Sequence, residues 1–439
     1  MAQASESEKP PGCQYTAADI ELAVNLARAI GLRPARKAMM TVFSWLKYKR
    51  QVPSYQAIRN WMQRIGLDRI KRPRKTDNAT WLVDHTCQTG KEKVLTILRV
   101  RSSQANQDDH PIKQSDLEPL AVVSRSRWTH ADVQAVYVAT CKKYGAPRAI
   151  LADQASDLQA PALALKKAYP KVIPLVDFKH FLANQLKQLL TGDPDYEAFT
   201  KHLKHSCACV QQTSLSHFVP RPLKRKARFM NMGPILEWAG AVLWHLDHPE
   251  SQACADVSPE QMKTKFGWLH SLEDQIAQWK QCQDVIDAGV YLAATKGLSR
   301  ATPDAFRKLV EPLANCEMAR TIVQRSIEFL EHQAAQLSAN ETLPLSTEAI
   351  ESVFARYKAL EKQHSKEGFS GLLLALGTLL RPVTEKEVLR SFQSVKCKDV
   401  KEWIKACLGR TYTSKRQKVF REYSTATKSS REIATAIAA

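Results

Sequence analysis

The sequence has 439 residues, of which 44% are hydrophobic and 25% charged, and 64 Lys and Arg outnumber 44 Asp and Glu to give a net charge of +20. These values predict a globular protein of roughly three domains and exclude a fibrous or largely disordered chain. The longest nearly unbroken apolar run, residues 371–380, is about half of the ~20 residues that a membrane-spanning helix needs, and the first residues lack a signal peptide's apolar core.

Positive charge is concentrated at the two ends of the chain. Residues 1–75 hold 15 Lys and Arg against 5 Asp and Glu (net +10), and residues 381–439 hold 14 against 6 (net +8). Such an excess attracts phosphate backbones, so a nucleic acid is the expected partner. The ten cysteines are scattered without a CxxC pair, which predicts reduced thiols inside a cell.

Three short helices are predicted near the N-terminus, over residues 18–30, from 38 to 45, and after Ser54 as an N-cap. The third helix carries apolar residues on one face and four polar residues on the other: Gln56, Arg59, Asn60 and Gln63. This pattern is typical of a helix-turn-helix, whose last helix enters the major groove of DNA. The alternative is a helical bundle that binds a protein.

A basic segment follows the third helix and ends the predicted N-terminal domain, residues 1–76. Its cations are expected to track the DNA backbone, and a charged hinge is the alternative. These cations are Lys71, Arg72, Arg74 and Lys75.

The pattern then changes to alternating strands and helices. Strands are predicted over 81–84, 93–100, 120–124, 149–152 and 171–176, and helices over 131–144 and 156–168. Short connections favour an antiparallel meander for the first three strands, whereas crossover helices make the later strands parallel. Pro174 indicates that the last strand lies at a sheet edge.

Acidic residues stand at the ends of two of these strands. Asp84 closes the first strand and Asp153 follows the fourth, so the two carboxylates are expected to lie side by side on neighbouring strands. Such a pair can bridge two divalent metals, and oxygen-only ligands suit Mg²⁺ or Mn²⁺. The alternative is that each aspartate only ends a strand or caps a turn.

A third acid must come from a distant helix, because residues 182–345 are almost entirely helical in pattern. The helix that follows Ser346 or Thr347 places Glu351 and Lys358 two turns apart on one side, an acid for a metal and an amine for a phosphate. Glu348, one turn earlier, is the rival for the third acid.

The strand order and these acids resemble a DDE-type transposase of the RNase H-like integrase superfamily. Asp84, Asp153 and Glu351 match its three acids, and Asp177 to His180 is similar to the Cys/Asp-x-x-His pattern of insertion-bearing transposases. The Glu-x6-Lys spacing is similar to the end of the Tyr-Arg-Glu-Lys signature of bacterial insertion sequences. Pro344 and Thr347 stand where that signature has Tyr and Arg.

The resemblance implies an α/β, RNase H-like core with a mixed five-stranded sheet, interrupted by a large all-α insertion and preceded by the helix-turn-helix domain. It implies a core over 77–182, an insertion over 183–344, a core completion over 345–382 and a basic C-terminal region over 383–439. A basic run in the insertion is expected to contact phosphates, with a solvated loop as the alternative; it includes Lys224, Arg225 and Lys226.

The implied activity is binding of the terminal repeats of a mobile element, followed by DNA cleavage and strand transfer. Asp84, Asp153 and Glu351 would hold two Mg²⁺ or Mn²⁺ ions, and His180 and Lys358 would steady phosphates. The protein would act on double-stranded DNA as a homodimer or larger assembly, on the nucleoid in a bacterial cytoplasm or in a eukaryotic nucleus. A non-catalytic DNA-binding regulator and a nuclease of the same fold are the alternatives.

Overall fold

The structure is a computed structural model and describes residues 7–89, 92–100, 111–220, 229, 232–251, 257–363, 370–409, 415–425 and 427. The chain divides into two compact units. One, here called the sheet unit, comprises residues 1–105, 112–174 and 347–439. The other, the helical unit, comprises residues 106–111 and 175–346, close to the predicted insertion at 183–344.

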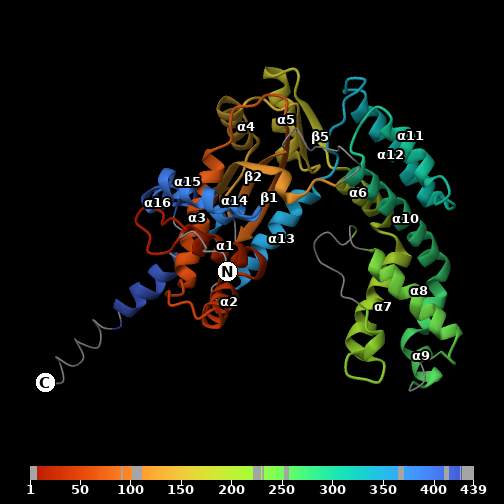
Figure 1. The fold of residues 1–439 in the computed structure, drawn as a ribbon. Coiled ribbons are helices and arrows are strands. Elements are labelled where there is room, and N and C mark those ends of the chain that lie inside the picture. The colour runs from red at the N-terminus through yellow and green to blue at the C-terminus, as the bar shows by residue number, and fades with distance from the viewer. Residues whose placement is uncertain are drawn as a thin grey trace. The chain divides into compact units, whose positions relative to one another are not determined.

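Five strands form one mixed sheet in the order β3-β2-β1-β4-β5 (Figure 1). β1 pairs antiparallel with β2 and parallel with β4, and β2 pairs antiparallel with β3. This confirms the predicted mixed five-stranded sheet, with β5 and its Pro174 at an edge. The strands are β1 Thr80–Thr89, β2 Glu92–Val100, β3 Leu117–Arg125, β4 Ala149–Ala152 and β5 Ile173–Val176.

Two helices, α4 (His130–Tyr144) and α5 (Ser156–Ala168), cover one face of the sheet. Trp81, Val83 and Ile150 point into the core beneath these helices. Because side chains alternate along a strand, Leu82 and Asp84 face the opposite side of the sheet. α13 (Glu348–Lys362) also belongs to the sheet unit and packs against β1 and the short helix η2 (Gln114–Asp116). Another short helix, η7 (Gly371–Leu374), follows α13 in the chain.

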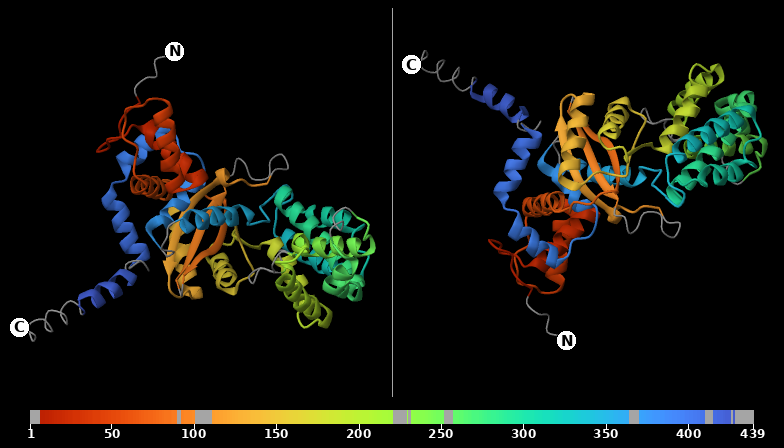
Figure 2. Two further views of the ribbon diagram at one scale, coloured as in Figure 1. Left: turned by 90° about the horizontal axis from the view of Figure 1, so that it is seen from below. Right: turned by 90° about the horizontal axis from the view of Figure 1, so that it is seen from above.

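The N-terminal and C-terminal helices of the sheet unit form a single packed group. Figure 2 shows the first helices lying beside those of residues 375–408. α3 contacts η7 and all three of the later helices. The members are α1 Ala17–Ile30, α2 Leu32–Trp45, α3 Tyr55–Lys71, α14 Ala375–Leu379, α15 Glu385–Ser394 and α16 Cys397–Leu408.

This packing differs from the predicted division of the chain at 76/77 and 382/383, since neither boundary separates compact units. A close helix crossing explains the difference. A Cβ atom on Gly66 of α3 would lie 1.8 Å from the carbonyl oxygen of Leu374, so only glycine allows this approach. The N-terminal helices are therefore built into the sheet unit.

A buried arginine joins α3 to the C-terminal helices. Arg69, whose side chain is 1% exposed, donates to both carboxylate oxygens of Glu387 at 2.6 and 2.9 Å. Its remaining bonds go to four backbone carbonyls, those of Gly377, Thr378, Arg381 and Pro382. Burial favours a higher pKa for Glu387, but the hydrogen bonds and charge of Arg69, with Arg381, hold it below its usual value.

Apart from the last two residues of β5, the described part of the helical unit contains helices and a single isolated bridge, Leu298 with Leu343. Its core is aromatic: Phe178 lies 5.5 Å from Phe306, centroid to centroid. No helix in the described residues of either unit is long and apolar enough to cross a membrane. The helices are α6 Phe178–Leu190, α7 Pro194–Val210, η3 Ser216–Phe218, α8 Gly233–Asp247, α9 Pro259–Phe266, η6 Gly267–Leu272, α10 Glu273–Thr295, α11 Thr302–Val310 and α12 Glu317–Ala334.

Candidate active site and nucleic-acid interface

Two aspartates occupy equivalent places on neighbouring strands. The β1–β4 ladder pairs Trp81 with Ile150 and ends at the pair Leu82 and Leu151. Asp84 lies two residues further along β1, and Asp153 follows the last residue of β4, so both aspartates lie just beyond this ladder at the same end of the two strands. Neighbouring strands of a sheet are about 4.8 Å apart, which brings the two positions close. The side chain of Asp84 belongs to the face away from α4 and α5, because that of Val83 points toward them.

Local hydrogen bonds fix each aspartate. Asp84 Oδ1 accepts from the backbone N–H of His85 at 2.6 Å. Asp153 Oδ1 accepts from Ala155 N–H at 3.0 Å, a turn that leads into α5, and Gln159 Nε2 donates to the Asp153 carbonyl at 2.9 Å. Asp153 therefore does stabilise a turn, while both carboxylates remain partly open to solvent.

The helix with the third predicted acid is held firmly against the sheet unit. Arg356 of α13 donates to the carbonyls of Arg28 at 3.0 Å and Leu379 at 3.2 Å. Glu351 and its rival Glu348 lie in the first turn of α13 and are half-buried. Because α13 packs against β1, this turn belongs to the same unit as the two aspartates.

In the part of the chain that the structure describes, no three His, Cys, Asp or Glu side chains form a group that could hold a metal ion. The carboxylate oxygens of Asp84, Asp153 and Glu351 are ligands of the type that a divalent cation such as Mg²⁺ prefers. Lys358, two turns after Glu351, is exposed and makes no ion pair with any described residue.

His180 belongs to the helical unit, not to the unit that holds the aspartates. Asp177, fully buried, caps α6 by accepting from the backbone N–H of His180 at 2.7 Å. The same carboxylate oxygen lies 2.9 Å from His180 Nδ1 and orients the ring. His180 therefore makes the contacts with Asp177 that are expected of a residue with a structural role at the start of α6.

A buried polar cluster on the other face of β1 was not predicted. His85 has a side chain only 4% exposed, and its Nε2 lies 3.4 Å from Asp157 Oδ2, which also contacts Lys93 Nζ at 3.3 Å. Burial, and then the charge of Lys93, lower the pKa of His85 to about 4 against the opposing effect of Asp157, so the ring is neutral near pH 7. In the sequence, the one sign of this cluster is a polar residue, His85, at a strand position whose side chain points into the core.

The predicted recognition helix is mostly covered. Gln56 and Asn60 are exposed and hydrogen-bond to each other at 3.1 Å. Gln63, however, is only 5% exposed, and burial lowers the pKa of Arg59. Helices α14–α16 and η7 pack against α3 and cover the second half of the face that would contact the major groove of DNA. The exposed polar side chains of α3 are therefore those of Tyr55, Gln56 and Asn60 in its first turns and of Lys71 at its last residue.

The basic linker is anchored rather than hinged. Thr76 N–H donates to the Tyr144 carbonyl at 2.9 Å, and Asn78 N–H donates to that of Ala146 at 3.0 Å. Arg72 forms ion pairs with Asp68 and Glu387. The charged groups of three exposed linker residues form no ion pair with a described residue: Lys71, Arg74 and Lys75.

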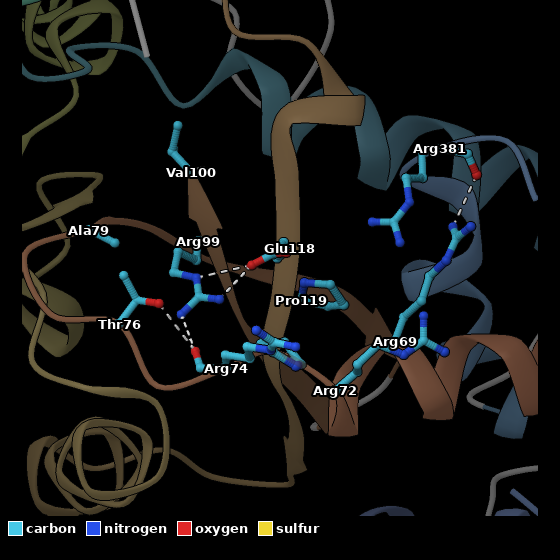
Figure 3. A pocket seen from close by; sticks show the side chains of 11 residues that line it. Arg69, Arg72, Arg74, Thr76, Ala79, Arg99, Val100, Glu118, Pro119 and Arg381 are labelled. Atoms are coloured by element: carbon cyan, nitrogen blue, oxygen red, sulfur yellow. Dashed lines mark hydrogen bonds and ion pairs between the residues drawn. The ribbon is translucent and has the colours of Figure 1, made fainter. Parts of the chain in front are cut away.

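A cavity of about 380 Å³ opens beside this linker (Figure 3). Arg99 crosses it and donates to Glu118 at 2.5 and 3.1 Å and to the Arg74 carbonyl at 2.9 Å. Arg69 and Arg72 are likewise engaged within the protein. Most of the positive charge around the cavity thus serves the fold. The basic run with Lys224, Arg225 and Lys226 lies outside the described residues.

Comparison with known proteins adds no assignment. No protein-family model matches the chain, and none of the curated proteins matches it either.

Proposed function

We propose that the protein is a DDE-type transposase that binds the ends of a mobile element and catalyses metal-dependent DNA cleavage and strand transfer. One observation carries the proposal: Asp84 on β1 and Asp153 directly after β4 lie toward the same end of two adjacent parallel strands in a β3-β2-β1-β4-β5 sheet. This is the strand order and the acid placement that an RNase H-like nuclease core requires. The net charge of +20 supports a nucleic-acid substrate.

Each of the predicted site residues has its own role in this reaction. Asp84 and Asp153 would bind Mg²⁺ or Mn²⁺ through carboxylate oxygens, with Glu351 of α13 as the third ligand. Such ions activate a water or a 3′-hydroxyl and stabilise the leaving oxygen of an in-line phosphoryl displacement. Lys358, exposed on the same helix, would pair with a DNA phosphate, and the ring of His180 would steady another.

We propose that a bound divalent metal ion joins Glu351 to the two aspartates, because α13 packs against β1 within the same unit. Substrate-bound protein would act as a homodimer or larger assembly that holds two element ends.

A strand-transfer assay tests the proposal. Labelled DNA ends from the sequence that flanks the gene are mixed with a supercoiled target plasmid, Mg²⁺ or Mn²⁺ and purified protein. Wild type should join the ends to the target, whereas Asp153→Asn should not; Asn keeps the turn but loses the charge. Asp274→Asn, an exposed aspartate on α10, is the matched control.

The other outcomes separate the alternatives. Cleavage without joining, even when pre-cut ends are supplied, indicates a nuclease of the same fold. Binding of the ends without cleavage in either metal indicates a non-catalytic regulator and refutes the proposal. Glu351→Gln and Glu348→Gln compared in the same assay identify the third acid.

A further inference from the structure

We infer that α2 and the loop after it, rather than α3, form the principal DNA-backbone contact of the N-terminal helices. The inference rests on the proposed function for the identity of the partner, but it concerns a surface that the active-site argument does not use. The surface, here called the α2 face, comprises the exposed side of α2 and residues 46–50.

The position of α2 leaves this surface open. α2 packs on α1 and α3 through a narrow buried stripe that includes Leu32, Met39 and Phe43. In Figure 1 the helix lies on the outer side of the N-terminal group. α3, by contrast, is enclosed by η7 and α14–α16 along its second half. A long nucleic acid can therefore reach α2 without displacing another helix.

The charge of this region has one sign. No Asp or Glu occurs between Glu21 and Asp68, a stretch that holds nine Lys and Arg. On the α2 face, four cations are exposed and form no side-chain hydrogen bond or ion pair with a described residue: Arg36, Lys37, Lys47 and Lys49. These four cations pair with no described carboxylate, and the one acid that contacts the α2 face, Asp19, pairs with Arg50, so the four are available to a polyanion.

An exposed aromatic ring lies among these cations. Trp45, the last residue of α2, is 81% exposed and has no ring partner among the described residues. Nearby, Arg50 stacks over Tyr48, 4.8 Å from its centroid, and pairs with Asp19 at 3.1 Å, which fixes the loop. A flat ring flanked by lysines suits contact with a sugar or an unstacked base next to phosphates.

The chemistry favours DNA over a lipid surface. A helix that lies in a membrane interface turns an apolar stripe toward the lipid. The apolar stripe of α2 is already buried against α1 and α3, and the cations of its exposed side are Arg33, Arg36 and Lys37. Arg33, Arg36 and Lys37 are three or four residues apart or adjacent, so they lie on one side of the helix, where they can contact consecutive phosphates of a duplex.

The test measures DNA binding without catalysis. A fluorescent duplex of about 30 base pairs is titrated by anisotropy in EDTA at several salt concentrations, since each lost phosphate contact lowers the salt slope by about 0.9. The triple variant Lys37→Gln, Lys47→Gln, Lys49→Gln should reduce the slope by about 2–3. The matched control, Lys398→Gln, Lys401→Gln, Lys405→Gln, removes three exposed charges from α16 of the same unit and should leave the slope unchanged.

Trp45→Ala gives an independent readout. It should weaken binding by about fivefold or more at every salt concentration without changing the slope, because the ring carries no charge. Trp244→Ala, the loss of a 51% exposed tryptophan in the helical unit, is its control. All seven side chains replaced on α2, on the loop after it and on α16 are exposed, and circular dichroism verifies that each variant is folded.

Each other outcome overturns the inference. If the α2 triple variant keeps the wild-type slope, or if the α16 control loses as much, α2 is not the contact. If Gln56→Ala with Asn60→Ala abolishes binding while the α2 variants bind normally, α3 is the contact after all. If wild type binds anionic vesicles but no DNA, the proposed function fails together with the inference, whereas DNA binding that ignores α2 leaves the proposed function intact.

Discussion

Replacing Glu387 by Gln tests how the two ends of the chain are held together. Glu387 is 6% exposed and accepts two charge-assisted bonds from Arg69, itself 1% exposed. Three further guanidinium groups, those of Arg72, Arg381 and Arg390, lie within 3.7 Å of the same carboxylate. The amide removes the one carboxylate that all four guanidinium groups contact, so we expect the sheet unit to lose about 3–5 kcal/mol of unfolding free energy.

The same pair predicts a pH dependence. Burial opposes ionisation of Glu387, but Arg69 and Arg381 outweigh it, so the folded pKa lies below the unfolded value of about 4.3. Above that value the full stabilisation is present, and it is lost as the pH falls through the folded pKa. The free-energy difference between wild type and Glu387→Gln should therefore shrink in acid below about pH 4.

Hydrogen exchange in increasing urea, read by mass spectrometry in peptides from α3 and α15, is the appropriate assay. A local probe is needed because a chain of two compact units need not unfold in a single two-state transition. Glu402→Gln on α16, whose side chain is 62% exposed, is the control and should change stability by less than about 0.5 kcal/mol. A loss in Glu387→Gln no larger than in this control refutes the reasoning.

Three further predictions concern the helix crossing, the aspartates and the thiols. Gly66→Ala should destabilise the sheet unit by about 1–3 kcal/mol or more in thermal melts, because its Cβ would meet the Leu374 carbonyl oxygen. The control Gly240→Ala on α8 places its Cβ in open space and should be neutral or stabilising. Equal melting temperatures for the two variants would contradict the close helix crossing. Asp84→Asn should lose the stabilisation that Mg²⁺ gives wild type in thermal melts, because it removes a carboxylate ligand; an undiminished Mg²⁺ shift would argue against this ligand. Cys141 and Cys282 should resist iodoacetamide at mildly alkaline pH while exposed Cys397 reacts, because burial raises the pKa of both buried thiols to about 12; rapid labelling of either would show that its site opens.

Sequence patterns predicted the sheet well because its signals are local. The strand expected at 149–152 is β4 at the same bounds, and the helix expected at 131–144 is α4, one residue longer. Ser54 caps α3 as its residue type suggests, accepting from Ala57 N–H at 3.1 Å. Such features depend on neighbours within a few positions, which the sequence displays directly.

The burial of α3 could not be predicted in the same way. Its partners come from residues 371–408, more than 300 positions later, and the polar residues Asp68 and Arg69 are buried because each finds a partner there. An Arg or Asp on a helix face reads as exposed until that partner is known. The relation of Glu351 to the aspartates is equally non-local, since it depends on how α13 is seated on β1 and not on spacing along the chain.

The split arrangement of the sheet unit has a consequence for its synthesis. Ribosomes release a chain from its N-terminus, and domains tend to fold as they emerge. α3 is made before the helical unit, whereas its covering helices and the Glu387 partner of Arg69 are made after it. For much of translation the buried side of α3 therefore faces the cell without its partners, which makes this side the natural target for a chaperone.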